Sequence, residues 1–142
     1  MTAKEYLRKV HDMRRRQDRL LERLIELKEQ AQGIKAITYD KDRVQTSPVN
    51  RFEELMVRLA DLETRYAFAI ARYNTEIQQI EAQIESLDNA DYEEVLRLRY
   101  LVKTPNYKPM RLEEIALRMH KSYPRIRHMH GEALEEFRRR FM

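Results

Sequence analysis

Two long runs of apolar and small residues, spaced alternately three and four positions apart, constrain this chain more than any other feature. The first run consists of Tyr6, Val10, Met13, Leu20, Leu24, Leu27, Ala31 and Ile34, interrupted only by Gln17. The second consists of Phe52, Leu55, Leu59, Leu62, Tyr66, Ala69, Tyr73, Ile77, Ile80, Ile84 and Leu87. Because such spacing places side chains along one side of a helix, it predicts two long amphipathic helices.

The segment between the two runs has little periodicity and contains Asp40, Asp42, Pro48 and Asn50. Since Pro48 has no amide proton to donate in a continuing helix, we predict a loop at 39–50. Two helices of similar length joined by such a loop form an antiparallel hairpin, in which each apolar seam covers the other. A parallel coiled coil between two chains satisfies the same spacing.

Charge favours the hairpin over the parallel coiled coil. Residues 2–38 carry 10 basic and 6 acidic side chains, whereas residues 52–96 carry 3 basic and 11 acidic ones. Opposite charge favours pairing the two helices with each other, although an exposed ion pair contributes only ~0.2–1 kcal/mol. A two-helix hairpin has a thin core, so we expect a further helix or a second copy to cover it, and we expect a homodimer through the hairpin.

Composition argues against several classes of protein. Two glycines and four prolines among 142 residues disfavour many-stranded sheets and glycine-rich phosphate loops. The absence of cysteine removes disulfides and thiol chemistry. No run reaches the ~18 apolar residues of a membrane span, and the first residues lack the apolar core of a signal peptide. We therefore expect a cytoplasmic protein that is not an enzyme, with no membrane association, cofactor or metal.

The C-terminal part of the chain is basic. Residues 97–142 carry 12 Lys and Arg against 5 Asp and Glu, whereas residues 1–96 carry 16 against 19. Such asymmetry is typical of a chain whose basic part binds nucleic acid or another polyanion.

The same part has the pattern of a helix-turn-helix. Capping side chains at 88–92 predict a helix that ends before Pro105, and two prolines in 103–109 predict a loop. A short helix follows, and Ser122 is a suitable N-cap for the last helix, with Pro124 in its first turn. The predicted core is Leu112, Ile115, Ala116, Met119, Ile126, Met129, Leu134 and Phe137. The fold class is thus all-α, with a helical hairpin at 1–87 and a helix-turn-helix domain at 88–142.

The stretch 112–137, LEEIALRMHKSYPRIRHMHGEALEEF, resembles the helix-turn-helix of region 4 in sigma-70 family factors. At the turn His120 stands where those factors usually have glycine, so we expect His120 to adopt a left-handed conformation. The whole chain, with TAKEYL, DRVQTSP, LADLE and LRLRYL, is similar to a family of small proteins of Gram-positive phages and prophages akin to the RinA/ArpU-type late transcription regulators. The two resemblances imply a regulator of phage or prophage transcription in the bacterial cytoplasm that binds promoter DNA and contacts host RNA polymerase.

The N-terminal part of the second helix of such a motif enters the major groove of double-stranded DNA. The predicted DNA-binding residues are Lys121, Tyr123, Pro124, Arg125, Arg127, His128, Gly131 and Arg138. We expect Arg127 to contact a guanine edge and Arg125 a phosphate, while Gly131 permits close approach. The alternative for Arg127 is an exposed ion pair with a glutamate. His128 and His130 point about 200° apart on a helix and do not converge on one metal ion.

Two functions remain open at this point. The first is a DNA-binding transcription regulator that reads an operator with the helix starting at Ser122. The second is an adaptor that docks on RNA polymerase or another phage protein without reading bases.

Overall fold

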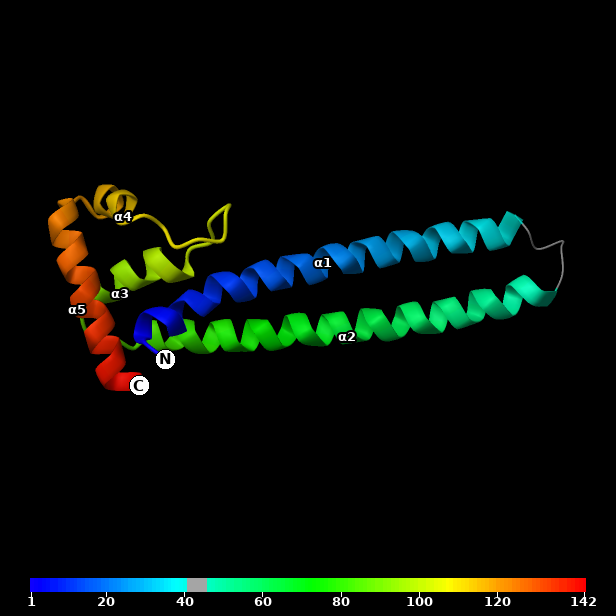
Figure 1. The fold of residues 1–142 in the computed structure, drawn as a ribbon, viewed down its shortest axis with the longest axis horizontal. Helices are drawn as coiled ribbons and strands as arrows, with labels where there is room; N and C mark the ends of the chain where they lie inside the picture. Colours follow the sequence, from blue (N-terminus) through cyan, green and yellow to red (C-terminus); the bar gives the residue numbers. More distant parts are fainter. Residues whose placement is uncertain (41–45) are drawn as a thin grey trace. The chain divides into compact units, whose positions relative to one another are not determined.

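The computed structural model describes the backbone of residues 1–40 and 46–142, and the side chains of 1–33 and 51–142. Its elements are α1 (Ala3–Asp40), α2 (Thr46–Glu85), α3 (Ala90–Leu96), the π-helix η1 (Arg97–Leu101), α4 (Leu112–Met119) and α5 (Tyr123–Phe141) (Figure 1). The described residues contain helices and connecting segments but no strand. The predicted all-α class is confirmed.

The two long helices reach further than the sequence pattern predicts. Helix α1 ends at Asp40 and α2 begins at Thr46, so the predicted loop at 39–50 is wrong for residues 39–40 and 46–50. Pro48 lies in the first turn of α2, where a helix needs no amide proton from it. The remainder of the predicted loop, 41–45, lies outside the described residues.

The chain divides into two compact units that differ from the predicted division at residue 87. Residues 1–15 and 73–142 form one, here called the terminal unit, and residues 16–72 form the other, the central unit. The first turns of α1 and the last turns of α2 therefore belong with the C-terminal helices. Spacing along a helix shows which side is apolar, but it does not show which part of the chain covers that side.

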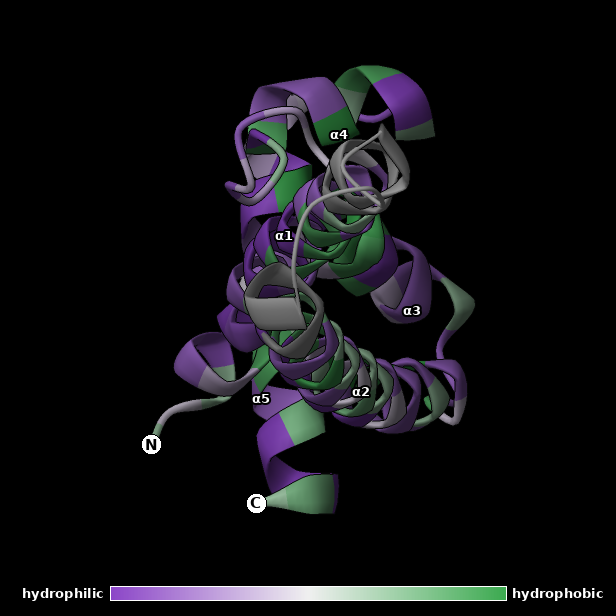
Figure 2. Cartoon of the chain, turned by 90° about the vertical axis from the view of Figure 1, so that its right-hand side faces the viewer, coloured by the Kyte–Doolittle hydropathy of each residue, from purple (hydrophilic) through white to green (hydrophobic). Residues whose placement is uncertain are grey.

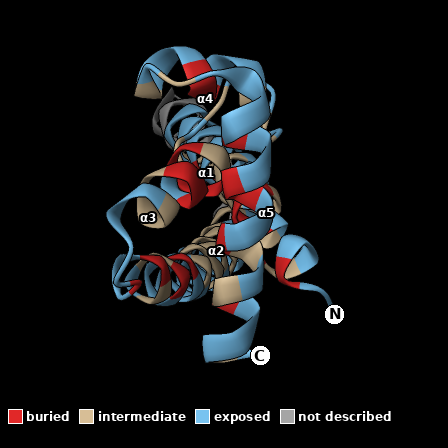
Figure 3. Ribbon diagram, turned by 90° about the vertical axis from the view of Figure 1, so that its left-hand side faces the viewer, coloured by how far each residue is buried: buried red, intermediate tan, exposed pale blue. Residues whose placement is uncertain are grey.

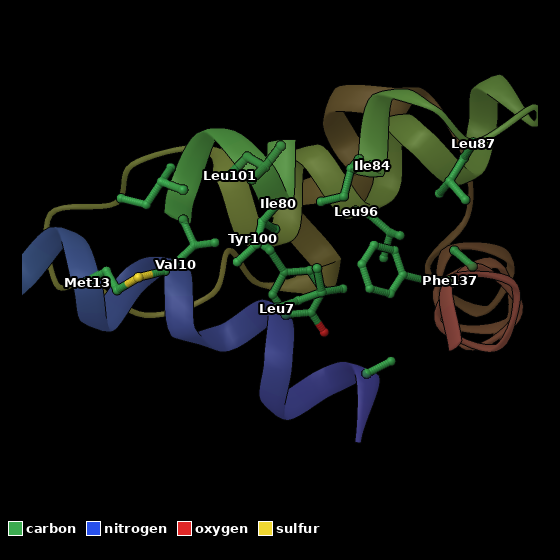
Figure 4. Packing of buried hydrophobic residues seen from close by; sticks show 13 residues of the cluster. Leu7, Val10, Met13, Ile80, Ile84, Leu87, Leu96, Tyr100, Leu101 and Phe137 are labelled. Atoms are coloured by element: carbon green, nitrogen blue, oxygen red, sulfur yellow. The ribbon is translucent and has the colours of Figure 1, made fainter. Parts of the chain in front are cut away.

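One core cluster of the terminal unit joins four helices and η1 (Figure 4). Leu7 of α1, Ile84 of α2, Tyr100 of η1 and Phe137 of α5 are all fully buried in it. The cluster also contains Ala3, Val10, Met13, Ile77, Ile80, Leu87, Leu96, Leu101 and Ala133. Leu7 and Ala3 lie outside the predicted seam of α1, because the core at this end contains side chains of α3, η1 and α5 in addition to those of α2.

A second cluster lies among α3, η1, α4 and α5. Its members are Val95, Leu98, Met110, Ile115, Ala116, Ile126 and Met129. Five of the eight predicted core residues, Ile115, Ala116, Ile126, Met129 and Phe137, are buried. Leu112, Met119 and Leu134 are half-buried at the edges of the two clusters.

Side chains of α1 hold the C-terminal end of η1. Nε2 of His11 lies 3.1 Å from the carbonyl oxygen of Arg99, and Nη1 of Arg14 donates to the carbonyl oxygen of Leu101. A carbonyl can only accept, so the neutral His11 ring carries its proton on Nε2. The Leu101 carbonyl belongs to the last turn of a helix, where carbonyl groups lack an intrahelical donor, and Arg14 supplies one.

Within the central unit, side chains of α1 contact α2. Nε2 of Gln17 donates to the carbonyl oxygen of Ile70 at 3.0 Å, and Nζ of Lys28 lies 3.6 Å from Oε1 of Glu63. In this unit Leu24 is the one buried apolar residue among the described side chains. Figure 2 shows that α1 and α2 carry both hydrophilic and hydrophobic residues along their length. The seam of this unit is therefore only half-covered.

Candidate nucleic-acid interface

Helix α5 begins where the sequence predicts. Ser122 is its N-cap, with φ −69° and ψ 152°, and its hydroxyl oxygen accepts from the backbone N–H of Arg125 at 3.3 Å. Pro124 lies in the first turn, where its fixed φ suits a helix and its missing donor is not needed. The cap and the proline together set the position of the first exposed residues of α5.

The turn before α5 is tight because His120 is left-handed. His120 has φ 55° and ψ 43°, which confirms the conformation expected at this position. The backbone N–H of Lys121 donates to the carbonyl oxygen of Ala116 at 3.0 Å and closes the end of α4. Lys121 is half-buried in this turn.

Five of the eight predicted DNA-binding residues share one open groove on α5. Tyr123, Pro124, Arg127, His128 and Gly131 line it, followed by two acidic residues, Glu132 and Glu135. All five are exposed, and in Figure 3 exposed residues run along the outer side of α5. The opposite side of the helix enters the two core clusters.

The other three predicted residues lie outside this groove. Arg125 is exposed in the first turn of α5, and Lys121 precedes the helix. Arg138 lies near the C-terminal end and makes an ion pair with Glu135, with Nη2 at 2.5 Å from Oε1. This pair lowers the pKa of Glu135 and raises the pKa of Arg138. Because the pair is exposed, it contributes little to stability and can be exchanged for another anion.

The charges along the groove change sign from its first turns to its last. Arg127 makes no ion pair within the described residues, so the structure does not show the glutamate partner considered for it. Nε2 of His128 lies 2.5 Å from Oε1 of Glu132, and Glu132 also accepts from the Tyr92 hydroxyl at 2.5 Å. That hydrogen bond raises the pKa of Tyr92. Within the groove, the positive charge of Arg127 therefore lies on the first turns of α5 and the negative charges of Glu132 and Glu135 follow it.

Gly131 leaves space on this surface. A methyl group added at its α-carbon would meet no atom within 4 Å beyond the local helix. The fold therefore does not require glycine here, and its effect on the surface is to let another molecule approach the helix backbone.

The two histidines of α5 lie in different environments. The side chain of His128 is 79% exposed, whereas His130 is buried and its Nε2 lies 2.8 Å from the Tyr100 hydroxyl. The pKa of His130 is lowered to about 4, chiefly by burial and also by the positive charges of Arg99, Lys4 and Arg8. The sequence did not identify His130 as a core residue, although it lies four residues after the buried Ile126 and three before Ala133.

Comparison with protein-family models, with curated proteins and with solved structures finds no match to this chain. Among the described residues, no helix combines the length and the apolar character needed to cross a bilayer.

Proposed function

We propose that this protein is a DNA-binding regulator of phage or prophage transcription, in which α4, the turn at His120 and α5 form a sigma-70 region-4-like helix-turn-helix. The observation that carries the proposal is the exposed groove on the first turns of α5, lined by Tyr123, Pro124, Arg127, His128 and Gly131. In helix-turn-helix proteins this part of the second helix enters the major groove. The resemblance to sigma-70 and RinA/ArpU-type proteins supports the same function.

Within this proposal Arg127 reads a base. Its guanidinium is exposed in the groove, and such a group can donate to O6 and N7 of guanine together, a contact that is worth ~1–3 kcal/mol of discrimination. Arg125 and Lys121 lie beside the groove and contact phosphate. Gly131 lets the helix approach the duplex backbone closely, because nothing projects from it.

The long helices serve as a dimerisation arm in this proposal. We propose that α1 and α2 form an antiparallel hairpin and that the central unit pairs with a second copy. Large apolar side chains of this unit are exposed, namely Leu21, Ile25, Leu55, Val57 and Phe68. A single helix-turn-helix reads few base pairs, so two copies on a two-fold symmetric site would give the length that specific binding needs.

A second candidate is the adaptor that docks on RNA polymerase or another phage protein. Glu132 and Glu135 line the C-terminal half of the groove, and Leu117 on α4 is 78% exposed. Carboxylates repel phosphate, and an exposed leucine is suited to a protein surface. These features favour a protein partner at that half of α5.

One experiment separates the two candidates. Purified full-length protein selects duplexes from a random library at about physiological salt, and light scattering measures its mass. An enriched palindrome with a dimer mass is expected for the regulator, and binding should fall steeply as salt rises. A single asymmetric site would indicate action beside polymerase without a second copy. No enrichment would reject base reading and favour the adaptor.

A further inference from the structure

The terminal unit contains a second cleft, of about 560 Å³, away from the groove on α5. It lies between the first turns of α1, the end of η1 and the loop that precedes α4. The polar residues that line the cleft include Arg8, His11, Arg15, Arg99, Asn106 and Lys108. Its volume is in the ~300–1,000 Å³ range of sites for small molecules.

The cleft is strongly cationic. Arg8, Arg15, Arg99 and Lys108 line it, and Asp12 is the one carboxylate among the lining residues. Asp12 lies 2.6 Å from Nη2 of Arg15 and therefore offsets a single charge. The side chains of Arg8 and Lys108 make no hydrogen bond or ion pair within the described residues.

Arg99, one of the residues that line the cleft, has an unsatisfied donor. Arg99 donates from Nη1 to the carbonyl oxygen of Met110 at 2.5 Å, but its Nε is buried and has no hydrogen-bond partner among the described residues. A buried donor without an acceptor is unfavourable unless a ligand or water supplies one. His11 adds no positive charge at neutral pH, because burial lowers its pKa.

The loop that forms one wall is held in place before any ligand binds. The backbone N–H of Met110 donates to the carbonyl oxygen of Arg99 at 3.3 Å, and Oγ1 of Thr104 donates to the carbonyl oxygen of Lys108 at 2.6 Å. Oδ1 of Asn106 accepts from the N–H of Lys108 at 3.2 Å, which leaves the Asn106 side-chain amide free to donate. Because the loop is already ordered, binding a ligand in the cleft costs less conformational entropy.

We propose that this cleft binds a phosphate group. Guanidinium groups donate in pairs to phosphate oxygens, and a lysine adds a point charge, so Arg8, Arg99 and Lys108 form a suitable set. The phosphate comes either from a phosphorylated small molecule or from the backbone of a bound duplex. Neither source requires base reading by α5, so the proposal does not rest on the function proposed above.

The test uses the folded full-length protein and nuclear magnetic resonance. Inorganic phosphate, pyrophosphate and a random-sequence duplex are titrated separately, each against sodium chloride of equal ionic strength. We expect saturable shifts of the Arg99 Nε–H and Asn106 amide signals with at least one of these probes. The double variant Arg8→Gln/Lys108→Gln should weaken that binding at least tenfold, whereas the control Arg118→Gln, an exposed cation on α4, should leave it unchanged.

Each outcome has a defined meaning. Saturation by pyrophosphate or phosphate without a response to the duplex supports a phosphorylated small molecule. The same shifts with the duplex alone support a backbone phosphate. Shifts that appear with chloride as well, that never saturate, or that persist in the double variant would overturn the proposal. Circular dichroism checks that the variants are folded, which is expected because Arg8 and Lys108 are exposed.

Discussion

Burial of His130 against Tyr100 couples the stability of the terminal unit to pH. The pKa of His130 is lowered from 6.5 to about 4 in the folded chain, and the groups that face it are Tyr100 and Arg99 of η1 and Lys4 and Arg8 of α1. Because the unfolded chain binds the proton more readily than the folded chain, the stabilisation that neutral His130 provides is complete above pH 6.5. It is lost as the pH falls from 6.5 towards 4.

The size of the effect follows from the two pKa values. Linkage gives a loss of about 2 kcal/mol between about pH 7.5 and pH 5, and roughly 3 kcal/mol in total below pH 4. His11 adds a loss of the same sign, since burial lowers its pKa also. The replacement His130→Gln removes only that part of the pH-dependent loss of stability that comes from His130.

Urea unfolding at about pH 7.5 and pH 5, followed by circular dichroism and by the amide signals of α5, measures this share. The pH dependence is compared within each variant, so a general loss of stability in His130→Gln does not affect the result. His128→Gln is the matched control, because it removes an imidazole that is 79% exposed on the same helix. If His130→Gln and the parent lost equal stability between the two pH values, burial of His130 would not be a source of the pH dependence.

Three further predictions concern the surfaces. Arg127→Ala should reduce discrimination between the selected operator and a scrambled duplex by about tenfold. Arg139→Ala, which removes a cation paired with Glu136, should weaken binding to both duplexes equally. Competition binding measures the ratio of the two affinities for each variant. Gly131→Ala should stabilise the protein by ~0.5–1 kcal/mol in urea, because alanine loses less conformational entropy than glycine in a helix and its methyl group meets no other atom. The same change should weaken DNA binding, so unchanged affinity would count against close approach of the duplex. Phe68→Glu, at a side chain that is 69% exposed, should shift the protein to monomer in light scattering; an unchanged mass would exclude this face from the dimer contact.

Local features of the fold were predictable from the sequence. Ser122 as N-cap, Pro124 in the first helical turn and the left-handed His120 each depend on a few neighbouring residues, and the structure has all three. The exposed face of α5 follows from the same local pattern, because burying Ile126 and Met129 directs Arg127 and Gly131 outward.

Features that depend on distant partners were not predictable. The π-helix at 97–101 is a change of hydrogen-bond register, and it coincides with side chains of α1 that bind its carbonyl groups. The inclusion of Leu7 in a core with Phe137 joins opposite ends of the chain, which no periodicity encodes. The cationic cleft was missed for the same reason, because Arg8, Arg99 and Lys108 are separated by long stretches of sequence.

The joining of both chain ends in one core has a consequence for synthesis in the cell. Leu7 leaves the ribosome early, whereas its core partner Phe137 follows 130 positions later. At ~5–20 residues per second the delay between the two is roughly 7–26 s. Until α5 has been made, the apolar start of α1 lacks the part of its native cover that α5 supplies, so the nascent chain depends on α2, η1 or a chaperone to cover it. A ribosome that stalls before α5 would release a product with this surface still open.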